Sequence, residues 1–321
     1  MDTAWMASLY NSENKFICGG TLITNLFVLT AGHCLVDKLR FVRLGEKDRS
    51  CKTSNCEVVR EYTVSRVIPH PRFRPNFFPI VYDIGLIKLN ETVDYNDSIR
   101  PICIIVDSAV HFPNNIQGRA YGWGKTNSSA QVFSDIIMSI TLTRTRQKNC
   151  SYLPVKNDQF CAVSSNGGDT CTGDSGGPLA ADYVYQGTKS YVQIGIVSFG
   201  SPNCNNKGVY TNVESYQDWI VEMVEKYNDT LLFEECSSQM HGVFAVRLWE
   251  VSLRSTIKGT LITDRFVLTV ARDLRTDATT IIARIKDSYV SVLKIDKHPD
   301  YSPSKPKRNN IALLELAQKN Y

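Results

Sequence analysis

An internal repeat joins two distant parts of this chain and constrains its fold more than any other feature. The segment GTLITNLFVLT at residues 20–30 recurs as GTLITDRFVLT at residues 259–269. The upstream segment WMASL at 5–9 matches FAVRL at 244–248 at the same offset, and further downstream DIGLIKL at 83–89 matches NIALLEL at 310–316. Self-similarity of this kind predicts the same structural unit twice. We expect a first domain over residues 1–228, a linker over 229–240 and a shorter second copy over 241–321.

Short strands account for most of the first domain. Apolar or alternating runs, divided by Gly, Pro, Asn and Ser, occupy residues 4–215, and this spacing predicts an all-β sandwich or barrel. The runs are Thr21–Thr30, Val58–Ile68, Ile84–Leu89, Gln117–Trp123, Ile136–Leu142 and Val192–Phe199. Over Tyr216–Tyr227 the apolar residues change to helical spacing, which predicts an amphipathic helix that closes the domain.

Composition excludes several classes of protein. A chain of 321 residues suits two or three hydrophobic cores. The content of 43% hydrophobic and 21% charged residues is ordinary for a globular protein, and the net charge of +4 is mild. The basic stretch at residues 305–308 is therefore interpreted as a solvated loop, not as a nucleic-acid site. No apolar run reaches the roughly 18 residues of a membrane span.

Cysteine and asparagine patterns indicate an extracellular protein. Ten cysteines favour an oxidising compartment, where disulfides persist. Five Asn-x-Ser/Thr sequons agree with this: Asn90, Asn96, Asn127, Asn149 and Asn228. Residues 1–5 show no basic stretch followed by an apolar run, so no signal peptide is visible, and we expect the true N-terminus upstream of Met1.

Three motifs supply the groups of a catalytic triad. They are TAGHC at residues 30–34, YDIGL at 82–86 and GDSGGP at 173–178, which contain His33, Asp83 and Ser175. A serine hydroxyl is a poor nucleophile at neutral pH, so it needs an imidazole to take its proton and a carboxylate to orient that imidazole. Taken singly, these residues could be a core histidine, a turn aspartate and a loop serine. Together they predict a serine peptidase.

These motifs resemble those of the trypsin-like, chymotrypsin-fold serine endopeptidases, especially the insect clip-type branch, over residues 4–228. The resemblance implies two six-stranded antiparallel β-barrels with the active site in the cleft between them and a C-terminal helix. The repeat would add a partial third barrel. His33 would act as general base and then acid, Asp83 would support it, and Ser175 would be the nucleophile. The backbone N–H groups of Gly173 and Ser175 would form the oxyanion hole.

The same resemblance implies the specificity. Asp169 lies six residues before Ser175, where the family places the residue at the base of the pocket for the substrate's P1 side chain. A carboxylate there suits Arg or Lys, so the expected partners are peptides or protein inhibitors that present such a residue. Ser198, Gly200 and Gly208 would complete the substrate-binding strands. Phe199 stands where the family usually has Trp.

Disulfide pairings follow from the resemblance as well. Cys18–Cys34, Cys150–Cys161 and Cys171–Cys204 would be three bridges general to the family, and Cys51–Cys56 a bridge of the clip-type branch. Cys103 and Cys236 remain. Cys103 is either free, paired with Cys236, or paired with a cysteine upstream of this sequence, which we favour.

No cofactor is expected. Some relatives bind calcium in the loop that here contains Glu46, Asp48 and Glu57, and clustered oxygens suit that ion. A solvated acidic loop is the interpretation we favour for these three residues.

Activation in the family depends on a newly cleaved apolar N-terminus, whose ammonium pairs with the aspartate before the catalytic serine. That aspartate is Asp174 here. The sequence enters the domain at Ala4–Met6, beyond the expected activation segment. We therefore expect Asp174 to lack its partner and its loop to relax toward a zymogen-like arrangement, because an uncompensated buried carboxylate is costly.

The repeat does not keep the catalytic groups. Arg272, Asp273 and Asn310 stand at the positions of His33, Cys34 and Asp83, and no serine motif follows. Arginine stays charged and cannot act as a base. We expect this copy to be inactive.

Two functional hypotheses follow. The first is a secreted, zymogen-derived endopeptidase that cleaves after Arg or Lys. The alternative is a non-catalytic relative that binds a protease, substrate or inhibitor, which the missing activation segment and the decayed repeat would favour. A plain β-barrel adhesion protein does not explain the triad.

Overall fold

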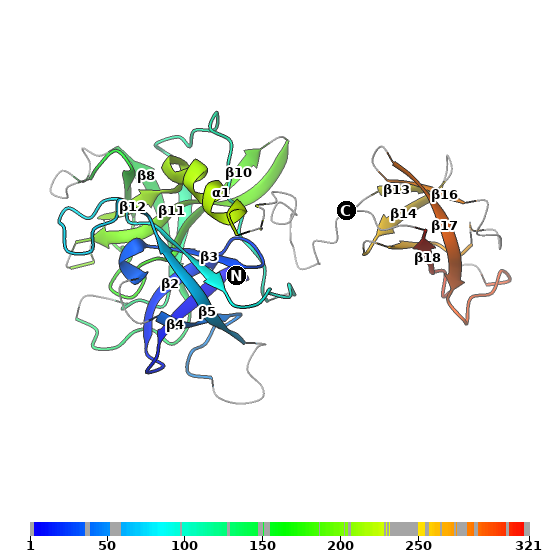
Figure 1. Ribbon diagram of the computed structural model, residues 1–321, viewed down its shortest axis with the longest axis horizontal. Coiled ribbons are helices and arrows are strands. Elements are labelled where there is room, and N and C mark those ends of the chain that lie inside the picture. Colours follow the sequence, from blue (N-terminus) through cyan, green and yellow to red (C-terminus); the bar gives the residue numbers. More distant parts are fainter. Residues whose placement is uncertain are drawn as a thin grey trace. The chain divides into compact units, whose positions relative to one another are not determined.

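The computed structural model divides into two compact units, Met1–Gln239 and Met240–Tyr321 (Figure 1). The described residues are 3–35, 39–51, 59–96, 98–126, 129–146, 150, 155–185, 187–201, 203–204, 207–227, 229, 231, 250–253, 257–263, 265–272, 274, 281–285, 288–305 and 308–317.

The first unit begins with a closed six-stranded antiparallel barrel in which the strands follow the ring order β1-β2-β3-β6-β5-β4. Its strands are β1 (Met6–Asn11), β2 (Phe16–Leu22), β3 (Phe27–Thr30), β4 (Leu39–Leu44), β5 (Arg60–Pro69) and β6 (Gly85–Leu89). A short 3₁₀ helix, η1 (Gly32–Leu35), follows β3. The apolar run Thr21–Thr30 is divided between two strands, β2 and β3. Thr24 turns the chain between them, since its hydroxyl accepts the N–H groups of Leu26 and Phe27.

A second closed barrel follows, with the ring order β10-β11-β12-β9-β8-β7. It contains β7 (Gln117–Gly122), β8 (Met138–Thr145), β9 (Gln159–Val163), β10 (Pro178–Tyr185), β11 (Thr188–Gly200) and β12 (Lys207–Asn212). The all-β architecture of two six-stranded antiparallel barrels is confirmed.

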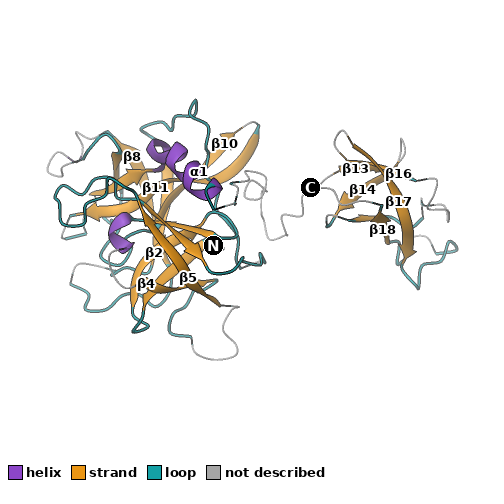
Figure 2. Ribbon diagram, viewed as in Figure 1, coloured by secondary structure: helices purple, strands orange, loops and turns teal. Residues whose placement is uncertain are grey.

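The predicted C-terminal helix is present but shorter than expected. Its first turn is the 3₁₀ helix η3 (Val213–Tyr216), and α1 then spans Gln217–Glu225 (Figure 2). Ile220 and Val224 on α1 belong to the same buried cluster as the core of the first barrel. The helix therefore returns from the second barrel to pack on the first. Among the described residues, no helix combines the length and apolar character that a membrane span needs.

The two barrels of the first unit are joined by aromatic packing and a buried hydrogen bond. The Trp5 ring lies 5.3 Å from that of Tyr191, and the Phe16 ring lies 6.0 Å from that of Trp123. The hydroxyl of Thr21 in β2 donates to Oε1 of Gln193 in β11 at 2.7 Å. These contacts fix the barrels to each other and so fix any site formed between them.

The second unit is one closed barrel with the ring order β13-β14-β15-β18-β17-β16, which repeats the order of the first barrel strand for strand. Its strands are β13 (Glu250–Leu253), β14 (Ile257–Leu261), β15 (Phe266–Thr269), β16 (Ile282–Ile285), β17 (Ser288–Lys297) and β18 (Ala312–Leu316). It has its own core, which includes Val267, Val290 and Leu314. The sequence repeat is thus a repeat of topology, with one barrel where the first unit has two.

Three disulfides join described residues, and they are the pairs implied by the resemblance: Cys18–Cys34, Cys150–Cys161 and Cys171–Cys204. Cys51 and Cys103 are disulfide-bonded as well, while Cys56 and Cys236, their candidate partners, lie outside the described residues. Cys103 is therefore not a free thiol. Because its bond is made within this chain, it does not need the upstream partner that we favoured.

Candidate active site

His33 and Asp83 are brought together by the pairing of β3 with β6. Thr30 at the end of β3 lies opposite Gly85 at the start of β6, so the residues just beyond these strand ends become neighbours. Nδ1 of His33 lies 2.8 Å from Oδ2 of Asp83, and the backbone N–H of His33 donates to Oδ1 at 2.8 Å. Two bonds from one residue thus fix both oxygens of the carboxylate.

The Asp83 carboxylate is fully buried and well supplied with donors. Ser198 in β11 donates its hydroxyl to Oδ2 at 2.5 Å, and the Thr211 hydroxyl donates to the backbone carbonyl of Asp83 at 2.8 Å. Burial by itself would raise the pKa of Asp83, but the His33 charge and the hydrogen bonds from His33 and Ser198 outweigh it and lower the pKa. Asp83 therefore stays ionised at neutral pH.

His33 responds in the opposite direction. Burial alone would lower its pKa, but the charge and the hydrogen bond of Asp83 together raise the pKa above the usual value of 6.5. With Nδ1–H directed at Asp83, the other ring nitrogen, Nε2, is left to accept a proton. This is the tautomer that a general base requires.

Ser175 lies in a tight loop that packs beside His33. The N–H of Gly19 in β2 donates to the Ser175 carbonyl, and the N–H of Gly176 donates to the Val197 carbonyl in β11, each at 2.9 Å. Gly176 has φ of +78°, and a Cβ there would lie 3.1 Å from Sγ of Cys34. The loop is therefore pressed against the residue that follows His33.

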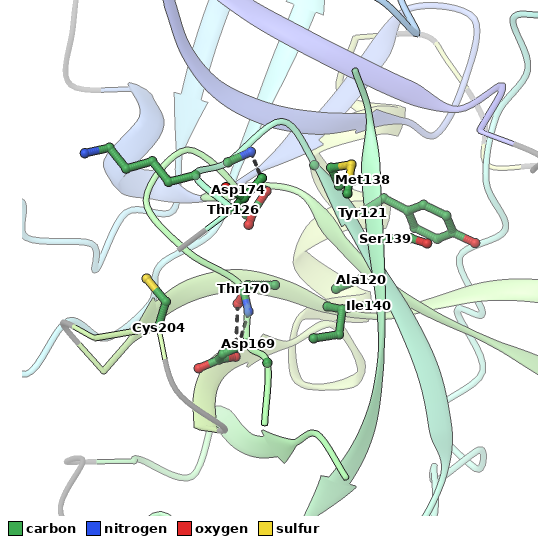
Figure 3. Close-up of a pocket in the computed structure, with 14 residues that line it drawn as sticks. Ala120, Tyr121, Thr126, Met138, Ser139, Ile140, Asp169, Thr170, Asp174 and Cys204 are labelled. Atoms are coloured by element: carbon green, nitrogen blue, oxygen red, sulfur yellow. Dashed lines mark hydrogen bonds between the residues drawn. The ribbon is translucent and has the colours of Figure 1, made fainter. Parts of the chain in front are cut away.

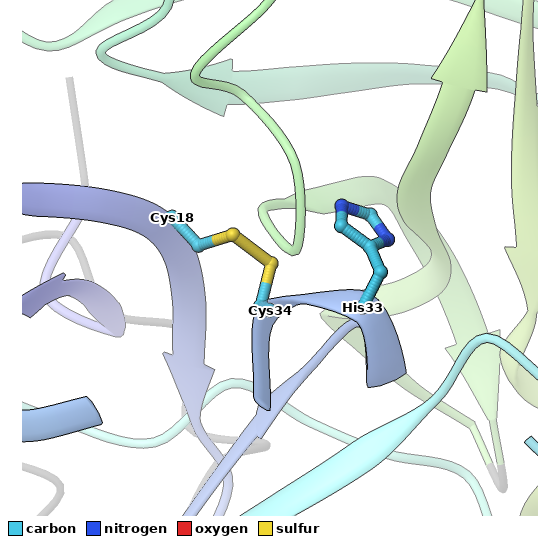
Figure 4. Close-up of side chains that lie close together, drawn as sticks. All are labelled: Cys18, His33 and Cys34. Atoms are coloured by element: carbon cyan, nitrogen blue, oxygen red, sulfur yellow. A yellow bond between two sulfur atoms is a disulfide. The ribbon is translucent and has the colours of Figure 1, made fainter. Parts of the chain in front are cut away.

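No hydrogen bond joins the Ser175 hydroxyl to His33 in the described part of the chain. Catalytic hydrogen bonds are often long without substrate and tighten when it binds. The sulfurs of Cys18 and Cys34 lie near the His33 ring (Figure 4). They are joined at 1.98 Å as a disulfide, so they offer no thiolate to a metal.

The two expected oxyanion-hole donors are available. Gly173 has φ of +101°, a conformation that glycine adopts readily. Within the described residues, the N–H groups of Gly173 and Ser175 donate to no acceptor of the chain. Two unused donors beside a candidate nucleophile are what a developing oxyanion needs.

Asp169 is the residue that we expected at the base of the P1 pocket. Its Oδ1 accepts the N–H of Thr170 at 2.8 Å, while Oδ2 is buried and has no hydrogen-bond donor among the described residues. A Cβ on Gly200 or Gly208 would lie 3.5 or 3.0 Å from this carboxylate, so the two glycines leave space directly beside it. Burial raises the pKa of Asp169 to about 6. An unpaired, desolvated carboxylate of this kind favours a cationic ligand.

Asp174 has two backbone partners. Its Oδ1 accepts the N–H of Gly124 at 2.8 Å, and Oδ2 accepts the N–H of Cys171 at 2.9 Å. Burial raises its pKa to about 6. Asp174 and Asp169 line one cavity of about 210 Å³, together with Met138 and other residues (Figure 3). The two amides satisfy Asp174 in part, but neither neutralises its charge.

The structure assigns Ser198 a place that sequence reasoning missed. Its side chain is buried and its hydroxyl donates to Asp83. The substrate-binding role that we expected for Ser198 stays a prediction. Thr211 was missed altogether. These residues lie 115 and 128 positions from Asp83 in the sequence, and nothing in a serine or threonine of a strand marks it as a partner of a distant carboxylate.

Two of the three acidic residues considered for calcium accept hydrogen bonds from the protein. Glu46 is buried, and its Oε2 accepts the hydroxyls of Ser8 at 2.5 Å and Tyr10 at 2.7 Å. Asp48 accepts the N–H and the hydroxyl of Ser50 through Oδ1, and Glu57 lies outside the described residues. Glu46 and Asp48 thus each have protein donors on one carboxylate oxygen, and a calcium site in this loop stays untested.

The second unit keeps the scaffold of this site without its chemistry. The N–H of Arg272 donates to Oδ1 of Asn310 at 2.8 Å, the same bond that His33 makes to Asp83. Asp273 lies outside the described residues. Asn310 carries no charge and Arg272 cannot act as a base. The second unit therefore has the backbone N–H bond of this site but neither the histidine nor the carboxylate.

A two-barrel domain in which a buried carboxylate orients a histidine beside a glycine-rich serine loop defines the chymotrypsin-like class of serine proteases. The sequence model of the Trypsin family matches residues 2–220. The chain therefore belongs to the trypsin family.

Its relatives include arthropod clip-type proteases. It is 35% identical over 247 residues to a phenoloxidase-activating enzyme of Bombyx mori. The aligned region covers 66% of this chain and 55% of that enzyme. It is 36% identical over 247 residues to melanization protease 1 of Drosophila melanogaster, over 67% of this chain and 61% of the protease. It is also 35% identical over 254 residues to the clotting factor G beta subunit of Tachypleus tridentatus, and this match covers 72% of the chain and 78% of that subunit. The chain thus spans little more than half of the moth enzyme.

Proposed function

We propose that the first unit is an endopeptidase that hydrolyses peptide bonds after Arg or Lys through His33, Asp83 and Ser175. The observation that carries the proposal is the 2.8 Å contact between Nδ1 of His33 and Oδ2 of the buried Asp83, beside the Ser175 loop. This contact leaves Nε2 free to take the Ser175 proton, which is the step that makes the hydroxyl a nucleophile.

The reaction proceeds in two halves. Ser175 Oγ attacks the scissile carbonyl carbon as its proton passes to Nε2 of His33, and the resulting imidazolium is stabilised by Asp83. The N–H groups of Gly173 and Ser175 stabilise the negative oxygen of the tetrahedral intermediate. His33 then protonates the leaving amine, and the peptide bond breaks to give an acyl ester on Ser175. Water then attacks the ester carbon as its proton passes to Nε2 of His33. The ester bond breaks, His33 returns the proton to Oγ of Ser175, and the carboxylic acid is released.

The preference for Arg or Lys rests on Asp169. Within the described residues its Oδ2 is buried and lacks a hydrogen-bond donor, and the donors to the rest of the carboxylate carry no countercharge, so a cationic side chain would meet a desolvated negative charge. A neutral side chain would leave that charge unpaired, and an acidic one would be repelled. Gly200 and Gly208 leave the space that a long side chain requires.

The setting proposed is extracellular, with synthesis as an inactive precursor. The relatives are named for phenoloxidase activation, melanization and clotting, and the disulfides suit an oxidising compartment. Asp174, buried and without a countercharge among its described contacts, is the group whose pairing would complete activation. Its neutralisation would order the loop that carries Gly173 and Ser175.

The second unit is proposed to be non-catalytic, because Arg272 and Asn310 replace the base and the carboxylate. Any activity would then reside in the first unit alone.

An active-site phosphonate and a series of P1 peptides test this function. The parent chain should be labelled at Ser175 and should cleave Arg and Lys peptides in preference to Leu or Glu peptides. The matched control is Ser175→Ala, which removes only the nucleophilic oxygen. Absence of labelling in the parent, under conditions where a related protease is labelled, would favour the non-catalytic alternative.

A further inference from the structure

Tyr82, the residue before Asp83, has a backbone conformation that is unusual for its type. Its φ is +53°, in the left-handed region, where bulky side chains are rare and the cost is about 1–3 kcal/mol. The N–H of Ile84 donates to the Tyr82 carbonyl at 2.8 Å, so residues 82–84 form a three-residue turn centred on Asp83. The direction of the Asp83 side chain depends on this turn.

A carboxylate from the other barrel holds the turn. Oδ2 of Asp158, just before β9, accepts the N–H of Tyr82 at 3.0 Å and also the hydroxyl of Tyr216. The carbonyl of Asp158 in turn accepts the N–H of Asn212 in β12 at 2.9 Å. Hydrogen bonds to an ionised group are stronger than neutral ones, so this link between the barrels can offset the strain at Tyr82.

Aromatic packing completes the support on the other side. The ring of His70 stacks on that of Tyr82 at 5.2 Å with an interplanar angle of 7°. His70 also meets the edges of Tyr216 at 5.3 Å and Trp219 at 5.1 Å. The Tyr82 side chain is therefore held in a stack while Asp158 holds its backbone.

The second unit contains the same turn, but an asparagine occupies the position of Tyr82. Asn309 has φ of +51°, and the N–H of Ile311 donates to its carbonyl at 2.9 Å. Asparagine tolerates this conformation, and its Nδ2 donates locally to the carbonyl of Asp300 at 3.3 Å. In the second unit, where Asn310 replaces the carboxylate, the turn therefore has a residue type that adopts a positive φ readily. In the first unit, the strained Tyr82 precedes Asp83 and is held by the carboxylate of Asp158.

The geometry points to Asp158 as a positioning residue that aims Asp83 at His33 by holding the Tyr82 turn. Among the described residues, its side chain accepts hydrogen bonds from Tyr82 and Tyr216 and from neither His33 nor Ser175, and its charge also acts on His70, which stacks on Tyr82. Its link to Asp83 therefore runs through the turn. The inference rests on the proposed function, since it presumes that the contact between Asp83 and His33 serves catalysis.

The test compares Asp158→Ala, Asp158→Asn and a matched control, Asp182→Asn, in the full chain. Asp182 is an exposed carboxylate of the same barrel that pairs with Lys189. Asp158→Ala should lower kcat about 10–100-fold with KM within about twofold, because small misplacements of catalytic groups cost about that much. It should also move the acidic limb of the pH profile to lower pH, because Asp83 would then raise the pKa of His33 less. Asp158→Asn keeps one acceptor oxygen and should recover most of kcat, while Asp182→Asn should match the parent.

A second variant separates positioning from simple destabilisation. Tyr82→Asn places at this turn the residue type that the second unit uses, so it should restore at least part of the kcat lost in Asp158→Ala. Unchanged kcat in Asp158→Ala, or a loss that Tyr82→Asn does not relieve, would overturn the inference.

A readout without turnover distinguishes this inference from the proposed function. The proton between Nδ1 of His33 and Asp83 should give a far-downfield NMR resonance in the parent, which Asp158→Ala should weaken and Asp182→Asn should preserve. If the parent shows the resonance but hydrolyses nothing, the proposed function fails and the positioning of Asp83 is still tested. If the resonance is identical in Asp158→Ala and the parent, the positioning inference fails whatever the activity.

Discussion

Ser198 donates its hydroxyl to Oδ2 of Asp83 at 2.5 Å, the same oxygen that meets the His33 ring. This bond joins β11 of the second barrel to a buried carboxylate of the first. The carboxylate is therefore held from both barrels, and its alignment depends on their packing.

Removal of this hydroxyl should weaken the alignment. Ser198→Ala leaves a buried acceptor short of one partner, which costs about 1–3 kcal/mol. We expect kcat/KM to fall about tenfold, with the P1 preference unchanged because Asp169 is untouched. Steady-state kinetics on Arg and Lys peptides would measure this. A change in the ratio of the two peptides would instead indicate that Ser198 contacts substrate.

The pH profile should report His33. Catalysis requires neutral His33, so activity should rise as pH passes the pKa of His33, which Asp83 raises above the usual 6.5. Asp83→Asn removes that charge, so the midpoint should move to lower pH. The same change should lower kcat by about 10⁴, because the imidazole loses its tautomer. The measurement is kcat/KM between about pH 5 and 9 for the parent and for Asp83→Asn. If the two midpoints agree, a group other than His33 controls the acidic limb of the profile.

Asp169 should make recognition of a cationic P1 residue dependent on pH. Burial raises its pKa to about 6, so below that pH the free pocket is protonated and neutral. We expect KM for Arg peptides to rise as pH falls through 6, with no such rise for Leu peptides. Asp169→Ser should lower kcat/KM for Arg peptides by about 10³ or more, because it removes the countercharge. Equal loss on Arg and Leu peptides would contradict the assignment of this pocket.

The two units should fold independently. Each has its own buried cluster, and the chain divides at Gln239. We expect a chain of residues 1–239 to express as a soluble protein whose Tm lies within a few degrees of the first transition of the full chain. Calorimetry of both would measure this. Insolubility of the shorter chain would show that the second unit supports the first.

Several features can be predicted from the sequence because they rest on local patterns. Short alternating runs, together with the family resemblance, predict the two barrels, and the motifs around His33, Asp83 and Ser175 mark the candidate triad. The strand boundaries are harder to predict. The run Thr21–Thr30 contains no Gly or Pro to mark a turn, and in the structure the hydrogen bonds of Ile23 and Thr24 divide it into two strands.

The sequence by itself determined the fold class, the repeat and the residue types of the site, because strand periodicity, turn residues and motif chemistry are local properties. Only the tertiary structure decided that Ser198 serves Asp83, that Asp158 holds the turn at Tyr82, and that the repeat closes into a barrel with the strand order of the first. Hydrogen bonds between residues 76 to 115 positions apart depend on how the two barrels pack. A polar side chain in a strand or loop gives no local sign of which distant partner it will meet.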